Sequence, residues 1–165
     1  MSSSTRERLT AAVLTVSDSS SRGERADLSG PAVVEFLKKH NFDVIAEEVV
    51  PDEQSEIRKA LIALAKSARL VVTTGGTGIA ARDVTPEATR AVCDRLVEGM
   101  AERMRAEGAK KTPYAVLSRA VCGARGDSLI LNLPGSPKGA VESLEAVAAV
   151  LAHAIQLLGG NTEHR

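Results

Sequence analysis

Two spacing patterns of hydrophobic residues alternate along the chain. Short apolar runs rich in β-branched residues predict buried strands, and apolar residues repeating every three to four positions predict helices. The predicted strands are 11–17, 42–51 and 69–74, and the predicted helices are 30–40, 52–68, one opening at Thr85-Pro86, and one from Ser136-Pro137 to a stop at Gly159-Gly160. Strands that alternate with helices predict an α/β fold, a three-layer sandwich with a mostly parallel central sheet.

Three segments have no single clear pattern. Residues 17–30 are small, polar and charged, and predict a loop. Residues 97–118 are charged and predict a helix in part, broken at Gly108 and Pro113. The charged segment 97–113 is either a lid or an oligomer contact, and the sequence leaves both alternatives open. Residues 120–134 are either two short strands joined by a turn or one strand after an irregular piece. We expect a single domain over 1–165, with a core from about 11 to 160 and frayed ends.

Composition excludes several classes of function. The 21 basic residues balance 21 acidic ones, and aromatic residues make up only 2% of the chain, which argues against nucleic acid as a partner. Cys93 and Cys122 lack a CxxC spacing, so we expect idle thiols in a reducing compartment, and the three histidines are scattered. The first residues, MSSSTRERL, contain no apolar h-region of a signal peptide, and no apolar run approaches membrane-spanning length. We therefore expect a soluble, cytoplasmic protein with no membrane partner.

Polar and glycine-rich loops follow the predicted strands. In an open parallel sheet, ligands bind beyond the carboxyl ends of the strands. In the stretch TTGGTGIAARDVTPEA (73–88), glycines without side chains would let backbone N–H groups approach an anion. An ordinary glycine-rich turn between a strand and a helix is the alternative interpretation. The loops expected to converge at that end are 17–29, 51–53, 75–85 and 132–138.

The glycine stretch is not one of the common nucleotide motifs. Gly76-x-Gly78-x-x-Ala81 loosely matches the dinucleotide fingerprint, but the next helix opens several residues too late, at Thr85-Pro86. A P-loop is excluded because no Gly-Lys-Ser/Thr follows the glycines. A dinucleotide-dependent oxidoreductase is therefore a distant alternative.

Charged residues lie in the same loops. Asp52 and Asp83 could hold Mg²⁺ together with phosphate oxygens, since Mg²⁺ is commonly bound by one or two carboxylates. Taken singly, Asp52 could instead be a helix N-cap and Asp83 an Asx-turn residue. Arg82, Arg119 and Lys138 could face phosphate; for Lys138, at a helix N-terminus, simple solvation is an equal explanation.

Six motifs in a fixed order carry a family resemblance: TVSDS (15–19), DLSGP (27–31), VPDE (50–53), TTGGTGIAARDVTPEA (73–88), LSRA (117–120) and NLPGSPKGA (132–140). The chain resembles the MogA/MoaB family, the molybdopterin adenylyltransferases of molybdenum cofactor biosynthesis, from about Ala11 to Gly160. The resemblance implies a homotrimer, or a hexamer built from trimers. It implies that ATP and molybdopterin are joined to give adenylated molybdopterin and pyrophosphate, with Mg²⁺.

The resemblance also implies roles for individual residues. Asp52 and Asp83 would be catalytic and would bind Mg²⁺. Ser118, Arg119 and Arg82 would lie on the pterin side. The residues expected to bind the nucleotide and its phosphates are Asp18, Gly75, Gly76, Thr77, Gly78, Pro134, Gly135, Ser136 and Lys138.

Four further features stay open under this resemblance. The chain could be a noncatalytic MoaB-type paralogue that binds the pterin, or a scaffold module of the kind found in larger proteins, which the short chain disfavours. A downstream molybdenum-insertion protein is a candidate partner. Which loop holds adenine, and whether molybdenum or tungsten is served, are not determined by these motifs.

Overall fold

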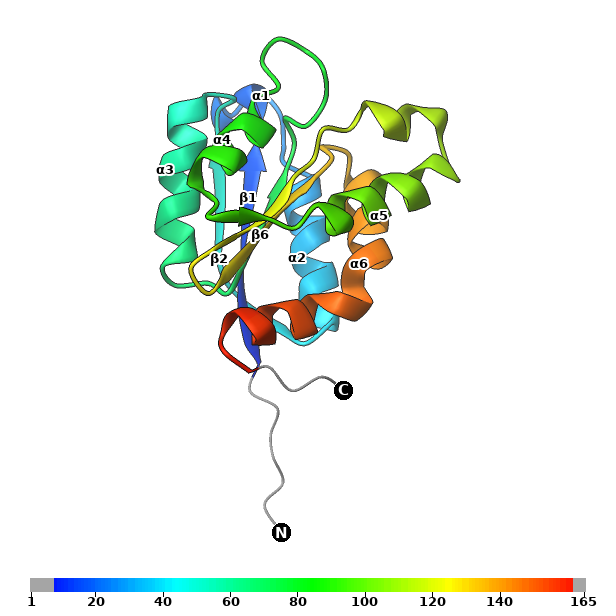
Figure 1. Cartoon of the computed structure of the whole chain (residues 1–165). Coiled ribbons are helices and arrows are strands. Elements are labelled where there is room, and N and C mark those ends of the chain that lie inside the picture. Colours follow the sequence, from blue (N-terminus) through cyan, green and yellow to red (C-terminus); the bar gives the residue numbers. More distant parts are fainter. Residues whose placement is uncertain (1–7, 162–165) are drawn as a thin grey trace.

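The computed structural model describes residues 8–161, which form a six-stranded sheet with helices on both faces (Figure 1). The strand order is β2-β1-β3-β6-β5-β4. The first four strands in this order run parallel, β5 is antiparallel to β6, and β4 is antiparallel to β5. The strands are β1 (Leu9–Val16), β2 (Phe42–Val50), β3 (Leu70–Thr74), β4 (Arg95–Leu96), β5 (Cys122–Arg125) and β6 (Ser128–Leu133). The α/β class and the mostly parallel sheet predicted from the sequence are confirmed.

The helices divide between the two faces of the sheet. They are α1 (Asp18–Ser21), α2 (Ser29–Lys39), α3 (Gln54–Ala65), α4 (Thr85–Val92), α5 (Glu98–Ala109), the 3₁₀ helix η1 (Pro113–Leu117) and α6 (Pro137–Leu158). Residues of α2, α5 and α6 pack on one face, and residues of α3 and α4 pack on the other. Along β1, Val13 belongs to the first core and Leu14 to the second, as expected when successive side chains of a strand point to opposite faces.

The structure corrects four local predictions. The segment predicted as a loop after β1 contains the short helix α1, whose N-cap Ser17 accepts a hydrogen bond from the backbone N–H of Ser20. Thr85, whose position before Pro86 predicts an N-cap, is instead the first residue of α4, and its hydroxyl donates to the carbonyl of Gly75. Asp52 is not the N-cap of α3, because that position is Glu53 and no side chain caps this end. Finally, α2 begins at Ser29, one residue before the predicted start.

The segment 120–134 forms two strands, which decides between the two predicted alternatives. Strands β5 and β6 pair from Cys122↔Leu131 to Arg125↔Ser128. The turn between them contains Gly126 at φ 55°, a left-handed conformation that glycine adopts without strain. The predicted fraying of the chain ends concerns residues 1–7 and 162–165, which lie outside the described residues.

Helix α6 is longer and more apolar than the sequence analysis allowed. By length and composition its 22 residues could cross a membrane, with a mean hydropathy of 1.5 in the most apolar window, so the statement that no apolar run approaches that length was wrong. Its buried residues pack in the core on the sheet face that α2 and α5 also cover; they are Leu144, Val147, Leu151 and Ile155. A core helix passes the same length and hydropathy test, so the test alone is weak evidence.

Candidate functional site

The loops that follow the four parallel strands lie together at one end of the sheet (Figure 1). The loops after β1 and β2 are joined by a bond from the Ser17 N–H to the Val50 carbonyl, 2.9 Å. The loops after β3 and β6 touch as well, since the Gly75 N–H donates to the Leu133 carbonyl and a Cβ on Gly135 would lie 3.4 Å from the Cα of Gly75. This is the convergence expected for the carboxyl ends of parallel strands.

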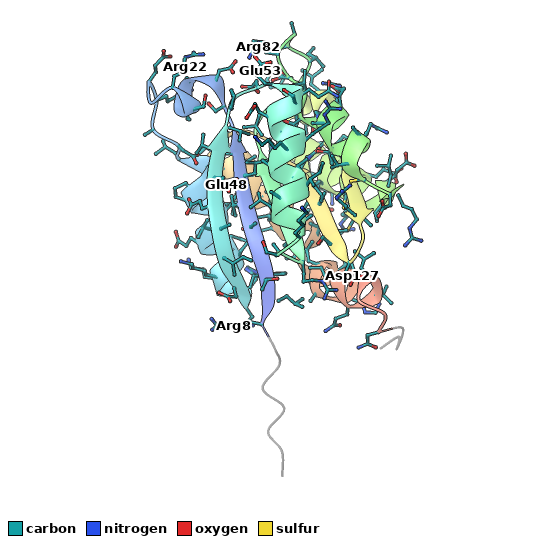
Figure 2. The ribbon with its side chains drawn as sticks, turned by 90° about the vertical axis from the view of Figure 1, so that its left-hand side faces the viewer. Arg8, Arg22, Glu48, Glu53, Arg82 and Asp127 are labelled. Atoms are coloured by element: carbon teal, nitrogen blue, oxygen red, sulfur yellow. The ribbon has the colours of Figure 1, made fainter. Side chains whose placement is uncertain are left out.

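Asp18 and Asp52 hold each other through a reciprocal pair of hydrogen bonds. The N–H of Asp18 donates to Oδ2 of Asp52 at 2.9 Å, and the N–H of Asp52 donates to Oδ1 of Asp18 at 3.0 Å. From the loop after β3, Arg82 donates to both oxygens of Asp18, at 2.6 and 3.0 Å, and to Glu53 at 2.9 Å. Figure 2 shows Arg82 beside Glu53, at the opposite end of the sheet from Asp127. Three loops are thus tied together by one arginine.

The two aspartates are shifted in opposite directions by this environment. Hydrogen bonds from Arg82 lower the pKa of Asp18 to about 2. The pKa of Asp52 is raised, chiefly because the carboxyl is partly buried, and further by the negative charges of Asp18 and Asp83. A partly buried carboxylate near two other acids is a group that a cation would stabilise.

The glycines of the loop after β3 let these carboxylates come close to the main chain. Gly75 and Gly76 have φ of 102° and 68°, in the region that favours glycine. A Cβ on Gly76 would meet the hydroxyl of Thr85 and would lie 3.1 Å from Oδ1 of Asp52, and a Cβ on Gly78 would lie 2.8 Å from Oδ2 of Asp83. Both aspartates therefore pack against bare backbone.

Asp83 also has a local role. Its Oδ2 accepts from the N–H of Ala80 at 3.0 Å, and its own N–H donates to the carbonyl of Ala80 at 3.0 Å. This is the turn-stabilising behaviour that the sequence allowed as the alternative interpretation of Asp83. One oxygen of the carboxylate takes part in it, and the residue still lines the cavity described below.

Arg119 fixes the outer part of the glycine loop. Its backbone N–H donates to the carbonyl of Thr77, its Nε to Gly78 and its Nη2 to Asp83, at 2.8, 2.7 and 2.7 Å. Its Nη1 donates to both carboxylate oxygens of Glu87 at 2.9 Å, which lowers the pKa of Glu87. The guanidinium of Arg119 therefore donates to protein acceptors and stabilises the conformation of the glycine loop.

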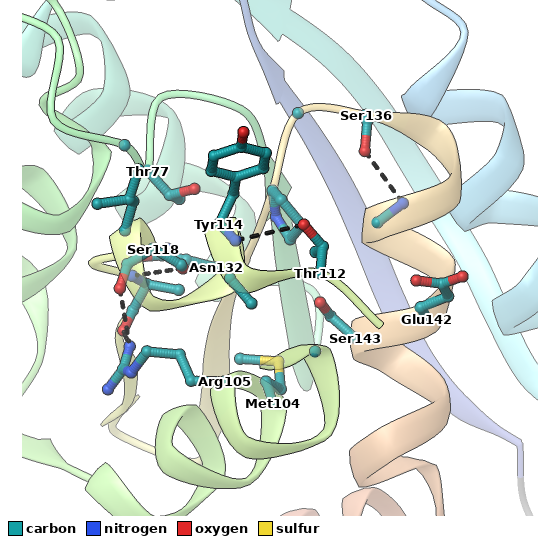
Figure 3. Close-up of a pocket in the computed structure, with 18 of the residues that line it drawn as sticks. Thr77, Met104, Arg105, Thr112, Tyr114, Ser118, Asn132, Ser136, Glu142 and Ser143 are labelled. Atoms are coloured by element: carbon teal, nitrogen blue, oxygen red, sulfur yellow. Dashed lines mark hydrogen bonds between the residues drawn. The ribbon is translucent and has the colours of Figure 1, made fainter. Parts of the chain in front are cut away.

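A cavity of about 490 Å³ opens between the glycine loop, the α5–η1 segment and the start of α6 (Figure 3). Some residues predicted for the site line it, and others lie outside its walls. The predicted residues that line it are Gly76, Thr77, Gly78, Asp83, Ser118, Pro134, Gly135 and Ser136. The predicted residues outside its lining are Asp18, Asp52, Gly75, Arg82, Arg119 and Lys138. Asp52 is nevertheless adjacent, because it packs on Gly76.

One wall of the cavity was missed by the sequence analysis. Met104, Arg105, Gly108 and Thr112 line it, all within the segment 97–113 left open as a lid or an oligomer contact. The charge and low apolar content of this segment gave no periodic signal, so only its contacts place it here. Tyr114, in η1, continues the same wall.

Asn132 was also missed, and it has the most extensive hydrogen bonding in the cavity wall. The side chain is fully buried. Its Oδ1 accepts from the N–H of Val121 at 3.1 Å, and its Nδ2 donates to the hydroxyls of Thr73 and Thr89 at 3.0 and 2.9 Å. It therefore joins β3, β6, α4 and the segment that carries Arg119. A lone amide in the apolar run SLILNL was the signal available in the sequence.

Lys138 lies at the start of α6 and is largely exposed. The helix is capped by Ser136, whose hydroxyl accepts from the N–H of Gly139 at 3.0 Å. Glu142 lies 4.0 Å from the amine of Lys138 and 3.8 Å from that of Lys111. Lys111 and Glu142 line the cavity, and Lys138, outside the lining, shares the carboxylate of Glu142 with Lys111.

The chain is similar in sequence to proteins of one known family. A family model described as "Probable molybdopterin binding domain" matches residues 12–153. The molybdopterin adenylyltransferase of Helicobacter pylori strain J99 is 45% identical over 153 residues, which cover 90% of this chain and 87% of that protein. The Escherichia coli K12 protein of the same name is also 45% identical, over 82% of this chain and 71% of its own length.

Solved structures show the same fold. The molybdopterin biosynthesis enzyme MoaB of Thermus thermophilus superposes with a TM-score of 0.87 and 55% identity, covering 92% of this chain and 97% of that one. The tungsten cofactor synthesizing protein MoaB of Pyrococcus furiosus superposes with a TM-score of 0.84 and 36% identity, covering 95% and 99%.

Proposed function

The chain belongs to the family of probable molybdopterin binding domains, and we propose that it is a molybdopterin adenylyltransferase, joining ATP and molybdopterin to give adenylated molybdopterin and pyrophosphate. The observation that carries the proposal is the 45% identity to proteins of that name over most of the chain. The geometry supports it, because two aspartates and a bare glycine loop border a cavity at the carboxyl ends of the strands.

The reaction is an in-line transfer. An oxygen of the terminal phosphate of molybdopterin attacks the α-phosphorus of ATP, and the bond from that phosphorus to the bridging oxygen of the β-phosphate breaks. Pyrophosphate leaves with the electron pair of the broken bond. Such a transfer depends on positioning and on neutralising charge more than on covalent help from the protein.

In this proposal the residues of the chain position the substrates. The N–H groups of Gly76, Thr77 and Gly78 face phosphate oxygens, whereas Gly75 shapes the loop because its own N–H donates to the carbonyl of Leu133. The capped start of α6, with Ser136 and Lys138, faces phosphate oxygens as well. The turn Pro134-Gly135 contacts the nucleotide, and Asp18, in the loop after β1, contributes to nucleotide binding as well. Ser118 lies on the pterin side. Arg82 and Arg119 support this arrangement by fixing the loops, since the Nε–Nη2 edge of each guanidinium donates to protein acceptors.

Asp52 and Asp83 are the residues that would hold Mg²⁺. No group of three or more acidic, histidine or cysteine side chains suited to a metal exists within residues 8–161, so the protein alone offers no closed metal cage. Mg²⁺ commonly takes one or two carboxylates together with substrate phosphates. The pKa of Asp52 is raised chiefly by partial burial, and a bound cation would stabilise its charged form. When bound, the ion would neutralise phosphate charge.

A second candidate is a pterin-binding paralogue without turnover. It is kept because a protein named MoaB is 55% identical to this chain, and because MoaB-type and MogA-type sequences resemble each other closely. We further propose that the chain is one domain, acts in the cytoplasm, and assembles as a homotrimer or hexamer. A downstream molybdenum-insertion protein is proposed as a partner.

Pyrophosphate release from ATP tests the function directly. The purified protein is incubated with ATP and Mg²⁺, with and without molybdopterin, and the pterin is recovered for mass spectrometry. We expect release that needs the pterin, a pterin mass raised by one adenylyl group, and loss of both on adding EDTA. A pterin that binds without any release would establish the paralogue instead.

A further inference from the structure

Three arginines surround the site, and their guanidinium groups are used differently. The edge formed by Nε and Nη2 can donate two parallel hydrogen bonds to one oxyanion. In Arg82 this edge is closed by the carboxylate of Asp18, at 2.6 and 3.0 Å. In Arg119 it is closed by backbone carbonyls, at 2.7 Å each. Neither arginine has this edge available for a ligand.

Arg105, on α5, keeps the same edge open. Its Nη1 donates to the carbonyl of Ala120 at 2.9 Å and more weakly to that of Ser118 at 3.4 Å. Within residues 8–161, no acceptor bonds to its Nε or Nη2, and no carboxylate forms an ion pair with it. The side chain is partly buried and lines the cavity, and Figure 3 shows its guanidinium directed toward Ser118. The bonds through Nη1 hold the group in place and leave three of its five N–H donors free.

The other charged residues in the cavity wall have partners. Glu107 accepts from Lys110 at 3.0 Å, and Lys111 lies 3.8 Å from Glu142. Asp83 accepts from backbone. Because a partly buried charge is stabilised by a counter-charge, an open guanidinium edge in this wall favours an anionic ligand.

We propose that Arg105 binds a phosphate group of a substrate in this cavity through Nε and Nη2. The proposal rests on the proposed function, which supplies two phosphate-bearing substrates. ATP carries a triphosphate and molybdopterin a terminal phosphate, and the chemistry recognised is the same: two oxygens of one phosphate group facing a fixed, planar fork. Which substrate supplies the phosphate is a question for experiment.

The same residue also ties α5 to the segment before β5, so substitutions must separate binding from support of the fold. Arg105→Gln removes the charge, and Arg105→Lys keeps the charge but lacks the planar fork. Arg103→Gln is the matched control, because Arg103 lies two residues away on the same helix, outside the cavity lining and largely exposed.

Calorimetric titration of the full chain with ATP and, separately, with molybdopterin tests the proposal. We expect Arg105→Gln to weaken binding of one of them by about 10- to 100-fold, the range for losing charge-assisted hydrogen bonds. Arg105→Lys should fall between Arg105→Gln and wild type, and Arg103→Gln should match wild type. A selective loss with molybdopterin assigns its terminal phosphate to Arg105, and a selective loss with ATP assigns the triphosphate.

Unchanged affinity for both substrates in Arg105→Gln would overturn the proposal. So would an equal loss of both in a variant whose melting temperature has also fallen, because that result assigns Arg105 to structure alone. If the wild type binds neither substrate, the proposed function fails, and inorganic phosphate becomes the probe. Phosphate that raises the melting temperature of wild type and Arg103→Gln but not of Arg105→Gln would then still support an anion site, and an equal rise in all three would refute it.

Discussion

Asp18 and Asp52 are 34 positions apart, yet each donates its backbone N–H to the carboxylate of the other, at 2.9 and 3.0 Å. The pair fixes the loop after β1 against the loop after β2 and brings two acids together beside the glycine loop. Arg82 neutralises Asp18 directly, while Asp52 keeps a raised pKa. The site is therefore held in an arrangement that favours a cation at Asp52.

Neutralising Asp52 should separate activity from stability. In Asp52→Asn we expect pyrophosphate release to fall by about 100-fold or more, because a charged ligand for Mg²⁺ and phosphate handling is lost. The melting temperature should stay constant or rise, because the substitution removes a partly buried charge that repels Asp18 and Asp83. Asp83→Asn should lower the rate as well. Full activity in both variants would remove the catalytic roles proposed for them.

Replacing Gly76 by alanine should disturb the site more than the same change at another left-handed glycine. At Gly76 (φ 68°) the new Cβ meets Thr85 and Asp52; at Gly126 (φ 55°) it meets nothing within 4 Å. Gly126→Ala therefore reports backbone strain alone, roughly 1–2 kcal/mol. Gly76→Ala should lose more in chemical denaturation and should also lose activity, whereas Gly126→Ala should keep it. Equal losses at the two sites would mean that the packing against Asp52 is unimportant.

Asn132→Leu should weaken the protein and misplace the glycine loop. The substitution leaves the buried N–H of Val121 without an acceptor, at a cost of roughly 1–3 kcal/mol in the free energy of unfolding. Ser128→Ala is the control, since Ser128 is a buried polar residue at the other end of the same strand and donates to the carbonyls of Ala65 and Ala68. Both variants should lose stability in urea titrations, but only Asn132→Leu should raise KM or lower kcat.

Arg82→Gln should bring the pKa of Asp18 back toward an ordinary value near 3.9 from about 2. Since the folded-state pKa is the lower one, ionised Asp18 contributes stability above its unfolded pKa, and this contribution disappears as the pH falls toward 2. In wild type the free energy of unfolding is larger at neutral pH than at pH 2, and this difference should be smaller in the variant. Carboxyl NMR titration of Asp18 measures the shift; an unmoved pKa would contradict the role given to Arg82.

The two thiols should resist alkylation in the folded protein. Burial raises the pKa of Cys93 to about 11 and that of Cys122 to about 12, so very little thiolate, the reactive form, exists at pH 8. We expect no modification by iodoacetamide at pH 8 within the time that the urea-unfolded chain reacts fully. Mass spectrometry of the intact protein counts the modified thiols. Rapid labelling of the folded chain would mean that the cysteines are accessible.

Much of the fold could be read from local pattern. The runs that predicted β1, β2 and β3 match the strands within two residues at each end. The runs of β1 and β3 are apolar because these strands are buried, whereas β2 lies at the sheet edge and has an exposed residue at every second position over 43–47. The helix after Ser136-Pro137 was equally clear from its cap and its apolar stripe. Helix α1 was not, since four residues of small polar sequence have no periodicity to detect.

The order of the elements, the sheet end at which the polar loops gather, and the family could all be predicted from the sequence, because hydrophobic spacing and motif order are properties of neighbouring residues. Which charged side chains already have protein partners could be seen only once the chain was folded. Arg82 meets Asp18 across 64 positions, and Arg119 meets Glu87 across 32. Such pairings depend on how distant loops pack, which spacing along the chain does not encode. The sequence drew attention to Arg82 and Arg119, whereas in the folded protein Arg105 is the arginine of the cavity wall whose Nε–Nη2 edge has no protein acceptor within residues 8–161.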